Sequence, residues 1–203
     1  MAHTPIMSHS PDAPDSTPRP VTTGRPPELL PLFDGYRLRR RRRSDAAGLN
    51  ATVTTNLEHL RPWMPWAGRA PEMAQSVEMA AAGERIWDEG TDFMYVVDTA
   101  ADPAAVLGAF GLHGRIGAGA LELGYWVDAA HTGRGIATGA ARALTEAALA
   151  LPGIVRVEIH CDEANTASAG VPRRLGYRFD RVEEVPISAP SETGRRQIWI
   201  RER

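Results

Sequence analysis

The sequence predicts an α/β fold of the α+β type, in which one mixed, mostly antiparallel sheet carries helices on its faces. Two observations predict it. The expected elements follow one another in the order strand, helices, strands, helix, strand, helix, strands, without an internal repeat. A chain of 203 residues, 43% of them hydrophobic, is long enough for one substantial core but short for two. We therefore expect about six to seven strands and about four helices in a single domain.

The first 30 residues differ in composition from the rest of the chain. Half of the 16 prolines fall within the first 31 residues, among Ser, Thr, Asp and His. A segment so poor in large apolar groups cannot offset the entropy that it loses on ordering. We predict that residues 1–30 form a disordered Pro-rich tail and that residues 31–203 form the folded domain.

A basic run follows, from Tyr36 to Arg43. Arg39 to Arg43 would suit a nucleic-acid or other polyanion surface. The alternative is a solvated edge strand, in which arginine stems cover the apolar surface around Leu38 while their charged ends stay in water. The formal net charge of -2 shows no global excess of basic residues, so we favour the edge strand and expect no nucleic-acid partner.

The remaining elements are read from periodicity and from helix-breaking residues. Helices are expected from Ala46 to about Glu58 and from about Glu72 to Asp88, with an aromatic, proline-containing loop between them at Leu60–Trp66. Alternation predicts an antiparallel meander of three strands, Phe93–Asp98, Val106–Leu112 and Leu121–Val127. The last expected elements are a helix from Gly135 to about Ala150, a strand Ile154–His160, a short helix around Ala167–Leu175, and strands near Tyr177–Val185 and Arg196–Arg201.

The junction between the third meander strand and the following helix contains two glycines, Gly133 and Gly135. The first turn of a helix presents backbone N–H groups without partners, and the helix dipole adds positive charge there. Glycines let a phosphate group approach the backbone closely. The junction is therefore a candidate anion site; by this pattern alone several phosphate ligands qualify, and so does a tight turn without a ligand.

Four segments together resemble the GNAT acetyltransferases, and among them the RimJ/RimL branch. Thr132–Ala137 is similar to the family's acetyl-CoA signature of Gln or Arg, two residues, Gly, one residue, and Gly or Ala. Leu60–Trp66 resembles the aromatic loop of the branch, and Glu122–Val127 resembles its fourth strand. Asn165–Tyr177 matches its spacing of Asn, Ser, Val and Leu-Gly-aromatic. The resemblance covers about residues 32–201.

The resemblance implies a GNAT-like domain with a splayed central strand pair and with acetyl-CoA as co-substrate. The backbone of the helix start would hold the diphosphate, through residues Gly133, Arg134, Gly135, Ile136, Ala137 and Thr138. The pantetheine arm would pair with the strand backbone of Tyr125, Trp126 and Val127, and Asn165 and Ser168 would also bind the cofactor.

Two residues depart from the family pattern. Thr132 lacks the long side chain that is usual at the first signature position, so we assign it no phosphate contact. Pro172 stands inside the expected short helix, where it would remove one backbone hydrogen bond and shorten or kink the helix.

Acetyl transfer to an amine needs a neutral nucleophile, donors for the developing oxyanion and a proton source for the departing thiolate. The resemblance makes Glu122 the first candidate base and Glu158 the second. Glu122 could equally clamp a substrate ammonium or face solvent, and strand alternation could aim Glu158 away from the site. Ser168 matches the position from which this branch is thought to protonate the cofactor sulfur; the alternative is that it caps the short helix.

The expected acceptor is a primary amine, on a peptide N-terminus or a small molecule, with Trp63, Trp66 and Glu122 as candidate substrate-binding residues. The alternative function is a non-catalytic acyl-CoA-binding or regulatory module. The histidines lack metal-ligand spacing, so we expect no metal, and Cys161 is expected in the core. Without a signal pattern or an apolar membrane span, we expect a cytoplasmic protein with no membrane partner. The resemblance also allows a homodimer.

Overall fold

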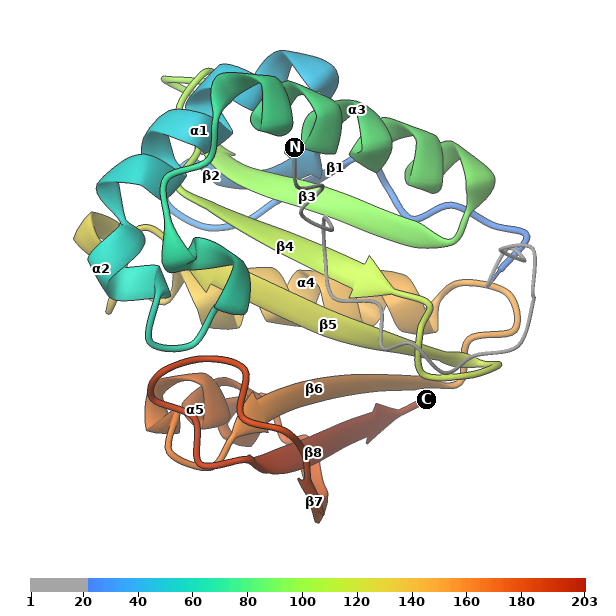
Figure 1. Ribbon diagram of the computed structural model, residues 1–203. Coiled ribbons are helices and arrows are strands. Elements are labelled where there is room, and N and C mark those ends of the chain that lie inside the picture. The colour runs from blue at the N-terminus through green and yellow to red at the C-terminus, as the bar shows by residue number, and fades with distance from the viewer. Residues whose placement is uncertain (1–21) are drawn as a thin grey trace.

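A computed structural model describes residues 22–203 and shows one eight-stranded sheet with helices on both faces (Figure 1). The strand order is β1-β2-β3-β4-β5-β6-β8-β7. Neighbouring strands are antiparallel, except that β5 and β6 are parallel. The strands are β1 (Leu29–Pro31), β2 (Tyr36–Arg40), β3 (Asp92–Thr99), β4 (Gly108–His113), β5 (Ala120–Val127), β6 (Arg156–Asp162), β7 (Arg178–Glu184) and β8 (Arg195–Glu202). The predicted α+β class and the mostly antiparallel sheet are confirmed.

The helices of the described chain divide between the two faces of the sheet. They are α1 (Ala46–Thr55), α2 (Leu57–Leu60), α3 (Met73–Glu89), α4 (Ile136–Leu149) and α5 (Thr166–Arg174). Leu121 and Leu123 share the main core with the apolar side of α4. Leu49 of α1 packs on Val96 in a second cluster. Because successive strand residues point to opposite faces, Glu122 points away from α4.

The strand count exceeds the expected six to seven because β1 lies within the segment that was expected to be a tail. Part of that segment, residues 1–21, lies outside the described residues. Residues 22–30 contact the domain: the hydroxyl of Thr22 donates to the carbonyl of Pro152 at 2.8 Å, and the hydroxyl of Tyr95 donates to the carbonyl of Pro27 at 2.8 Å. These hydrogen bonds and the pairing of β1 fix a proline-rich stretch that composition alone predicts to be disordered.

The basic run lies in β2, and β1 covers the edge of that strand. The expected edge position of β2 is therefore wrong. Arg39 donates hydrogen bonds to the carboxylate of Asp98 at 2.6 Å and to that of Asp45 at 2.7 and 2.8 Å. Arg40 donates one to the carboxylate of Asp88 at 2.6 Å. Asp45, six residues away, and the distant Asp88 and Asp98 thus neutralise much of the positive charge, which explains why the run is compatible with a folded sheet.

The two central strands separate after a short paired stretch. β5 and β6 are in register over three positions, from Ala120 opposite Arg156 to Glu122 opposite Glu158. Beyond these positions β5 keeps only β4 beside it among the described strands, and β6 keeps only β8. Figure 1 shows the two strands diverging toward α5. The predicted splay is present, and we call this region the β5–β6 split.

Two helices differ in detail from expectation. The helix expected from Ala46 to Glu58 is interrupted at Asn56, whose φ of -109° and ψ of 11° leave the helical range. The side-chain oxygen of Asn56 accepts a 2.7 Å hydrogen bond from the N–H of Ala129, which ties the interruption to the segment after β5. The short helix α5 continues to Arg174 although Pro172 lies inside it.

Candidate active site

The start of α4 presents six consecutive backbone N–H groups, those of residues 133–138, that have no hydrogen-bond acceptor within residues 22–203. The first bond of the helix is donated by Gly139 to the carbonyl of Gly135 at 2.9 Å. Gly133 and Gly135 adopt left-handed φ angles of 73° and 82°, which side chains with a Cβ disfavour. A Cβ at Gly133 would meet nothing within 4 Å. The open, donor-rich turn fits an anionic diphosphate.

Side chains beside this turn add to its positive character. The guanidinium of Arg174, on α5, donates to the hydroxyl of Thr138 at 3.2 Å, and this arginine is exposed. Arg134 bonds the carbonyl of Ala130 at 3.1 Å. The Thr132 hydroxyl donates to the carbonyl of Ala129 at 2.9 Å, so it is engaged locally. No motif in the sequence indicates that Arg174 lies here, because its position depends on the packing of α5 beside α4.

On the sheet face opposite α4, Arg115 holds Glu122 through two hydrogen bonds. Its Nε donates to Oε2 at 2.8 Å and its Nη2 donates to Oε1 at 2.6 Å. Burial alone would raise the pKa of this carboxyl, but the hydrogen bonds and charge of Arg115 outweigh burial and hold the pKa of Glu122 at about 2. Such a weakly basic anion is suited to binding a cation rather than to taking up a proton.

His160 lies between the two glutamates that the sequence singles out. Its Nε2 is 2.6 Å from Oε2 of Glu158, and its Nδ1 is 3.7 Å from Oε2 of Glu122. The other oxygen of Glu158 lies 2.7 Å from Nε of Arg156. Glu158 therefore points to the same face as Glu122, not away from it. Sequence reasoning assigned His160 no role, although its spacing of two residues from Glu158 places both side chains on one face of the strand.

Ser168 lies on the other side of the split, next to Tyr125. The Tyr125 hydroxyl oxygen is 3.2 Å from both the carbonyl oxygen and Oγ of Ser168. The side chain of Asn165 accepts a 3.1 Å hydrogen bond from the N–H of Ser168 and caps α5. Asn165, not Ser168, is thus the capping residue. Burial raises the pKa of Tyr125 above its ordinary value, so its hydroxyl stays protonated.

Tryptophan side chains form part of the sheet face that carries Glu122. Trp66 is 46% exposed, and its ring centroid is 6.4 Å from that of Trp126. Trp126 lies four residues after Glu122, on the same face of β5. Trp63 is partly buried in the same loop as Trp66. The exposed Trp66 ring and the Trp126 ring provide an apolar surface on the Glu122 side of the sheet.

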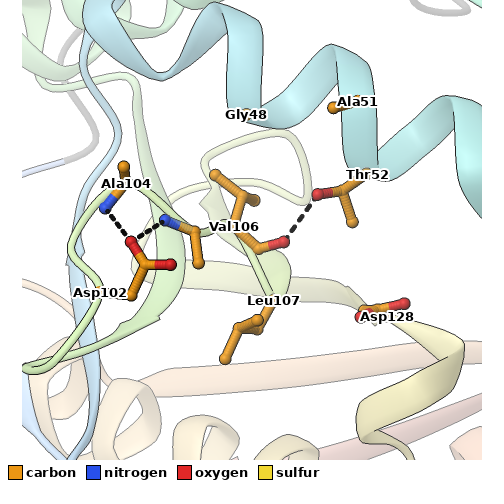
Figure 2. A pocket seen from close by; sticks show the side chains of 9 residues that line it. Gly48, Ala51, Thr52, Asp102, Ala104, Val106, Leu107 and Asp128 are labelled. Carbon is orange, nitrogen blue, oxygen red and sulfur yellow. Dashed lines mark hydrogen bonds between the residues drawn. The ribbon is translucent and has the colours of Figure 1, made fainter.

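A separate pocket of about 370 Å³ lies between α1 and the loop that leads into β4 (Figure 2). The Thr52 hydroxyl donates to the carbonyl of Val106 at 2.8 Å across it. Oδ1 of Asp102 accepts from the N–H groups of Ala104 and Ala105 at 3.2 and 3.3 Å. These polar groups bond one another, and none of the sequence-predicted site residues lines this pocket.

Three further expectations concern a metal site, the position of Cys161 and membrane-spanning helices. Within the part of the chain that the structure describes, no group of three or more His, Cys, Asp and Glu could hold a metal ion. Cys161 is buried in the main core, and burial raises the pKa of its thiol to about 11. Among the described helices, none combines the length and the apolar character needed to cross a bilayer.

The chain forms an α/β domain in which the free N–H groups of residues 133–138, called the cradle below, lie beside the β5–β6 split. A family profile described as acetyltransferase (GNAT) domain matches residues 36–178. The chain therefore belongs to the GNAT acetyltransferase family, which confirms the resemblance seen in the sequence.

Solved structures with a similar fold include members of the expected branch. The chain is 21% identical to RimL, a ribosomal-protein α-N-acetyltransferase in complex with coenzyme A, with a TM-score of 0.76 over 86% of this chain and 98% of that chain. It is 20% identical to Mycobacterium smegmatis RimJ in complex with CoA disulfide, with a TM-score of 0.76 over 87% and 88%. It is 18% identical to the microcin self-immunity acetyltransferase MccE in complex with acetyl-CoA and AMP, with a TM-score of 0.77 over 87% and 97%. Among curated proteins, none matches the sequence.

Proposed function

We propose that the protein transfers the acetyl group of acetyl-CoA to a primary amine by direct attack in a ternary complex. One observation carries the proposal: the free N–H groups of residues 133–138 lie next to a strand, β5, whose edge is unpaired beyond Glu122. A ligand with a diphosphate at one end and an extended, amide-containing arm can use both features. The coenzyme A and acetyl-CoA bound in RimL and MccE support this choice of ligand.

The residues of the cradle and of β5 have distinct roles in this proposal. Backbone N–H groups from Gly133 to Thr138 hold the diphosphate, and Arg134 and Arg174 add positive charge beside it. The backbone of Tyr125, Trp126 and Val127 pairs with the pantetheine arm, as a further strand would. When bound, acetyl-CoA supplies an acyl group activated as a thioester.

On the two sides of the split, side chains serve the acceptor and the leaving group. Glu122 holds the acceptor ammonium, and Trp63 and Trp66 line the acceptor side. Ser168 donates a proton to the thiolate that leaves, and Asn165 fixes Ser168 by capping α5.

The charge of the site favours an α-amino group on a peptide N-terminus as the acceptor. Glu122 and Glu158 are each paired with an arginine, so residues 22–203 do not present at the site the several free carboxylates that an aminoglycoside or a polyamine needs. An α-amino group has a pKa of about 8, against about 10 for a lysine side chain. It therefore loses its proton to a weaker base. A cytoplasmic location and a homodimer are further parts of this proposal, to be tested by cell fractionation and by light scattering.

The test combines calorimetry with acetyl-CoA and a thiol-release assay over N-terminal peptides, amino acids, polyamines and aminoglycosides. We expect saturable binding of acetyl-CoA and acceptor-dependent release of coenzyme A with peptides. Ser168→Ala is expected to lower kcat much more than it weakens acetyl-CoA binding. Tight binding without any acceptor-dependent release would instead favour the non-catalytic acyl-CoA-binding module, and absence of binding would exclude both.

A further inference from the structure

Each of the two glutamates predicted as bases has an arginine beside it. Glu122 accepts two hydrogen bonds from Arg115, and Glu158 lies 2.7 Å from Nε of Arg156. The two hydrogen bonds and the charge of Arg115 keep Glu122 negatively charged, so this carboxylate takes up a proton reluctantly. Oε2 of Glu158 is already engaged with the ring of His160 at 2.6 Å. The imidazole of His160 lies between the two carboxylates, and within residues 22–203 it has no arginine partner. His113 of β4 also lies on this face, but its Nδ1 is bonded to Asp92 at 2.8 Å, so among the described residues His160 is the imidazole placed between the two glutamates.

The hydrogen bonds of His160 define which ring nitrogen is basic. A carboxylate only accepts hydrogen bonds, so Nε2 of His160 donates its proton to Oε2 of Glu158 at 2.6 Å. The neutral ring then carries its lone pair on Nδ1. Nδ1 faces Oε2 of Glu122 at 3.7 Å, which is too long for a hydrogen bond. Two acceptors thus face each other, and a donor from another molecule is needed between them.

We propose that His160 is the general base of the reaction and that the acceptor amine binds between its Nδ1 and Oε2 of Glu122. A nitrogen atom about 2.8 Å from each of these atoms makes an ordinary hydrogen bond to both. Glu122 holds the positive charge of the ammonium, and His160 removes its proton. Glu158 acts as a positioning residue, which orients the ring and stabilises its protonated form. This inference rests on the proposed acetyltransferase function.

The position of His160 in the sheet agrees with this role. It lies two residues beyond Glu158, where β6 no longer pairs with β5. Alternation along β6 directs His160 to the Glu122 face, whereas Tyr125 points to the opposite face of β5, where it meets Ser168. The amine and the sulfur would therefore approach from the two sides of the split, with the thioester carbonyl between them.

The proton and bond changes balance. His160 takes one proton from the ammonium and later releases it to solvent. The amine nitrogen then forms a C–N bond to the thioester carbonyl carbon, and the C–S bond breaks with its electron pair remaining on sulfur. The second proton of the nitrogen leaves to solvent by the same route through His160, while Ser168 gives its hydroxyl proton to sulfur and regains one from solvent. The products are an N-acetyl amide, a free thiol and one proton in solution.

The groups around His160 predict how the rate depends on pH. Glu158 on β6 and Glu122 on β5 face the ring directly, and Arg156 and Arg115 pair with them. Of the neighbouring strands, β4 contributes one further titratable pair and β8 contributes an apolar residue. On β4, His113 is opposite Glu122 in register and is bonded to Asp92 at 2.8 Å, and on β8 the residue opposite His160 is the apolar Ile198. The rate is expected to fall below the pH at which the imidazole becomes protonated.

The test measures kcat and acetyl-CoA affinity against pH for the full chain, with the N-terminal peptide that the wild type acetylates fastest. In His160→Gln the side-chain amide can still donate to Glu158 but is not a base. We expect kcat near neutral pH to fall about 100-fold and the acetyl-CoA Kd to stay within twofold of wild type. The fall of kcat at low pH, which we call the acid limb of the profile, should disappear. His59→Gln, an exposed histidine on α2, is the matched control and should leave the profile unchanged.

A second variant keeps the test decisive if His160→Gln folds poorly. Glu158→Gln leaves the imidazole in place but removes the charge beside it, so the acid limb should move to lower pH with kcat reduced. A wild-type rate and profile in His160→Gln, or an unmoved acid limb in Glu158→Gln, would overturn the inference while leaving the acetyltransferase function standing. A wild-type protein that binds acetyl-CoA and acetylates no amine would overturn the proposed function, and the inference with it.

Discussion

The hydroxyl group of Tyr125 on β5 lies 3.2 Å from the backbone carbonyl oxygen of Ser168 on α5. In a regular helix the N–H of residue 172 would bond this carbonyl, and Pro172 has no N–H to donate. Tyr125 donates to the acceptor that the proline leaves free, and Oγ of Ser168, also 3.2 Å away, can donate to the phenol oxygen in turn. The proline that departs from the family pattern is thus accommodated by a residue of the site, and α5 continues past it.

Replacement of this tyrosine tests whether the contact positions Ser168. In Tyr125→Phe the ring can still stack on Phe110, at 5.6 Å between centroids, but the carbonyl and Oγ of Ser168 lose their partner. We expect a loss of about 1 kcal/mol in unfolding free energy and about tenfold in kcat, with unchanged acetyl-CoA affinity. Urea unfolding and steady-state kinetics provide the measurements.

The matched control for that variant is Tyr177→Phe. The Tyr177 hydroxyl is buried and lies 2.5 Å from the hydroxyl of Thr145, away from Ser168. It should lose a similar amount of stability and keep the wild-type kcat. Equal kcat losses in both variants would show that Tyr125 acts through general stability and not through Ser168.

Gly133 offers a test of the anion cradle. Gly133 and Gly153 have φ angles of 73° and 79°, and a Cβ at either position would meet nothing within 4 Å. Alanine should therefore cost both positions about 1–2 kcal/mol through the left-handed backbone. Only Gly133→Ala should also weaken acetyl-CoA binding, by about tenfold, because only there does the methyl group enter the space above the free N–H groups. Equal acetyl-CoA Kd values by calorimetry would place the diphosphate elsewhere.

The site divides into parts that local sequence predicts and parts that only the fold provides. The cradle at Gly133 and Gly135 is local, since glycines followed by a helical pattern determine the free N–H groups. The neighbours of Glu122 are not local. His160 comes from β6, which reaches β5 through the crossover helix α4, and the bidentate clamp depends on how the turn before β5 directs Arg115. Long-range strand pairing therefore determines which group at the site is basic. The periodicity of the sequence does not predict this pairing.

The N-terminal strand shows the same limit for the fold. Composition predicts that residues 22–30 are disordered, and the structure shows that this is wrong. Composition contains no information on the carbonyl of Pro27, which Tyr95 bonds, or on the register that sets Leu30 opposite Leu38. The domain supplies these partners, so a proline-rich stretch without internal hydrophobic pattern still becomes the outermost strand.

The ion pairs around Asp98 predict a large effect on stability. Asp98 is fully buried and is bonded by both Arg37 and Arg39, at 2.6–3.0 Å. Asp98→Asn leaves two arginines without their shared anion, and we expect a loss of about 3–5 kcal/mol. Asp88→Asn removes a partner of Arg40 that is 67% exposed, and it should cost less than about 1 kcal/mol. Thermal and urea unfolding compare the two, and equal losses would show that burial does not govern these pairs.

Acid unfolding tests the clamp on Glu122, because a depressed carboxyl pKa links folding to pH. The pKa of Glu122 is about 2 in the folded protein against an ordinary value of 4.5. The folded state therefore binds this proton more weakly than the unfolded chain does. The clamp's contribution is fully present above about pH 4.5 and is lost as the pH falls toward 2, and its size is on the order of 3 kcal/mol.

Glu122→Gln removes this ionisation, so its unfolding free energy should fall less steeply than that of the wild type between pH 4.5 and 2, and the two curves should converge at the acid end. Asp180→Asn is the control. The pKa of Asp180 is also lowered, by hydrogen bonds from Arg181 and Arg178. These three side chains are at the surface, where solvent screening makes their contribution to the unfolding free energy small. Urea unfolding at each pH measures the slopes. Parallel curves for wild type and Glu122→Gln would mean that Arg115 does not hold the carboxylate in solution, and Glu122 would then be available again as a base.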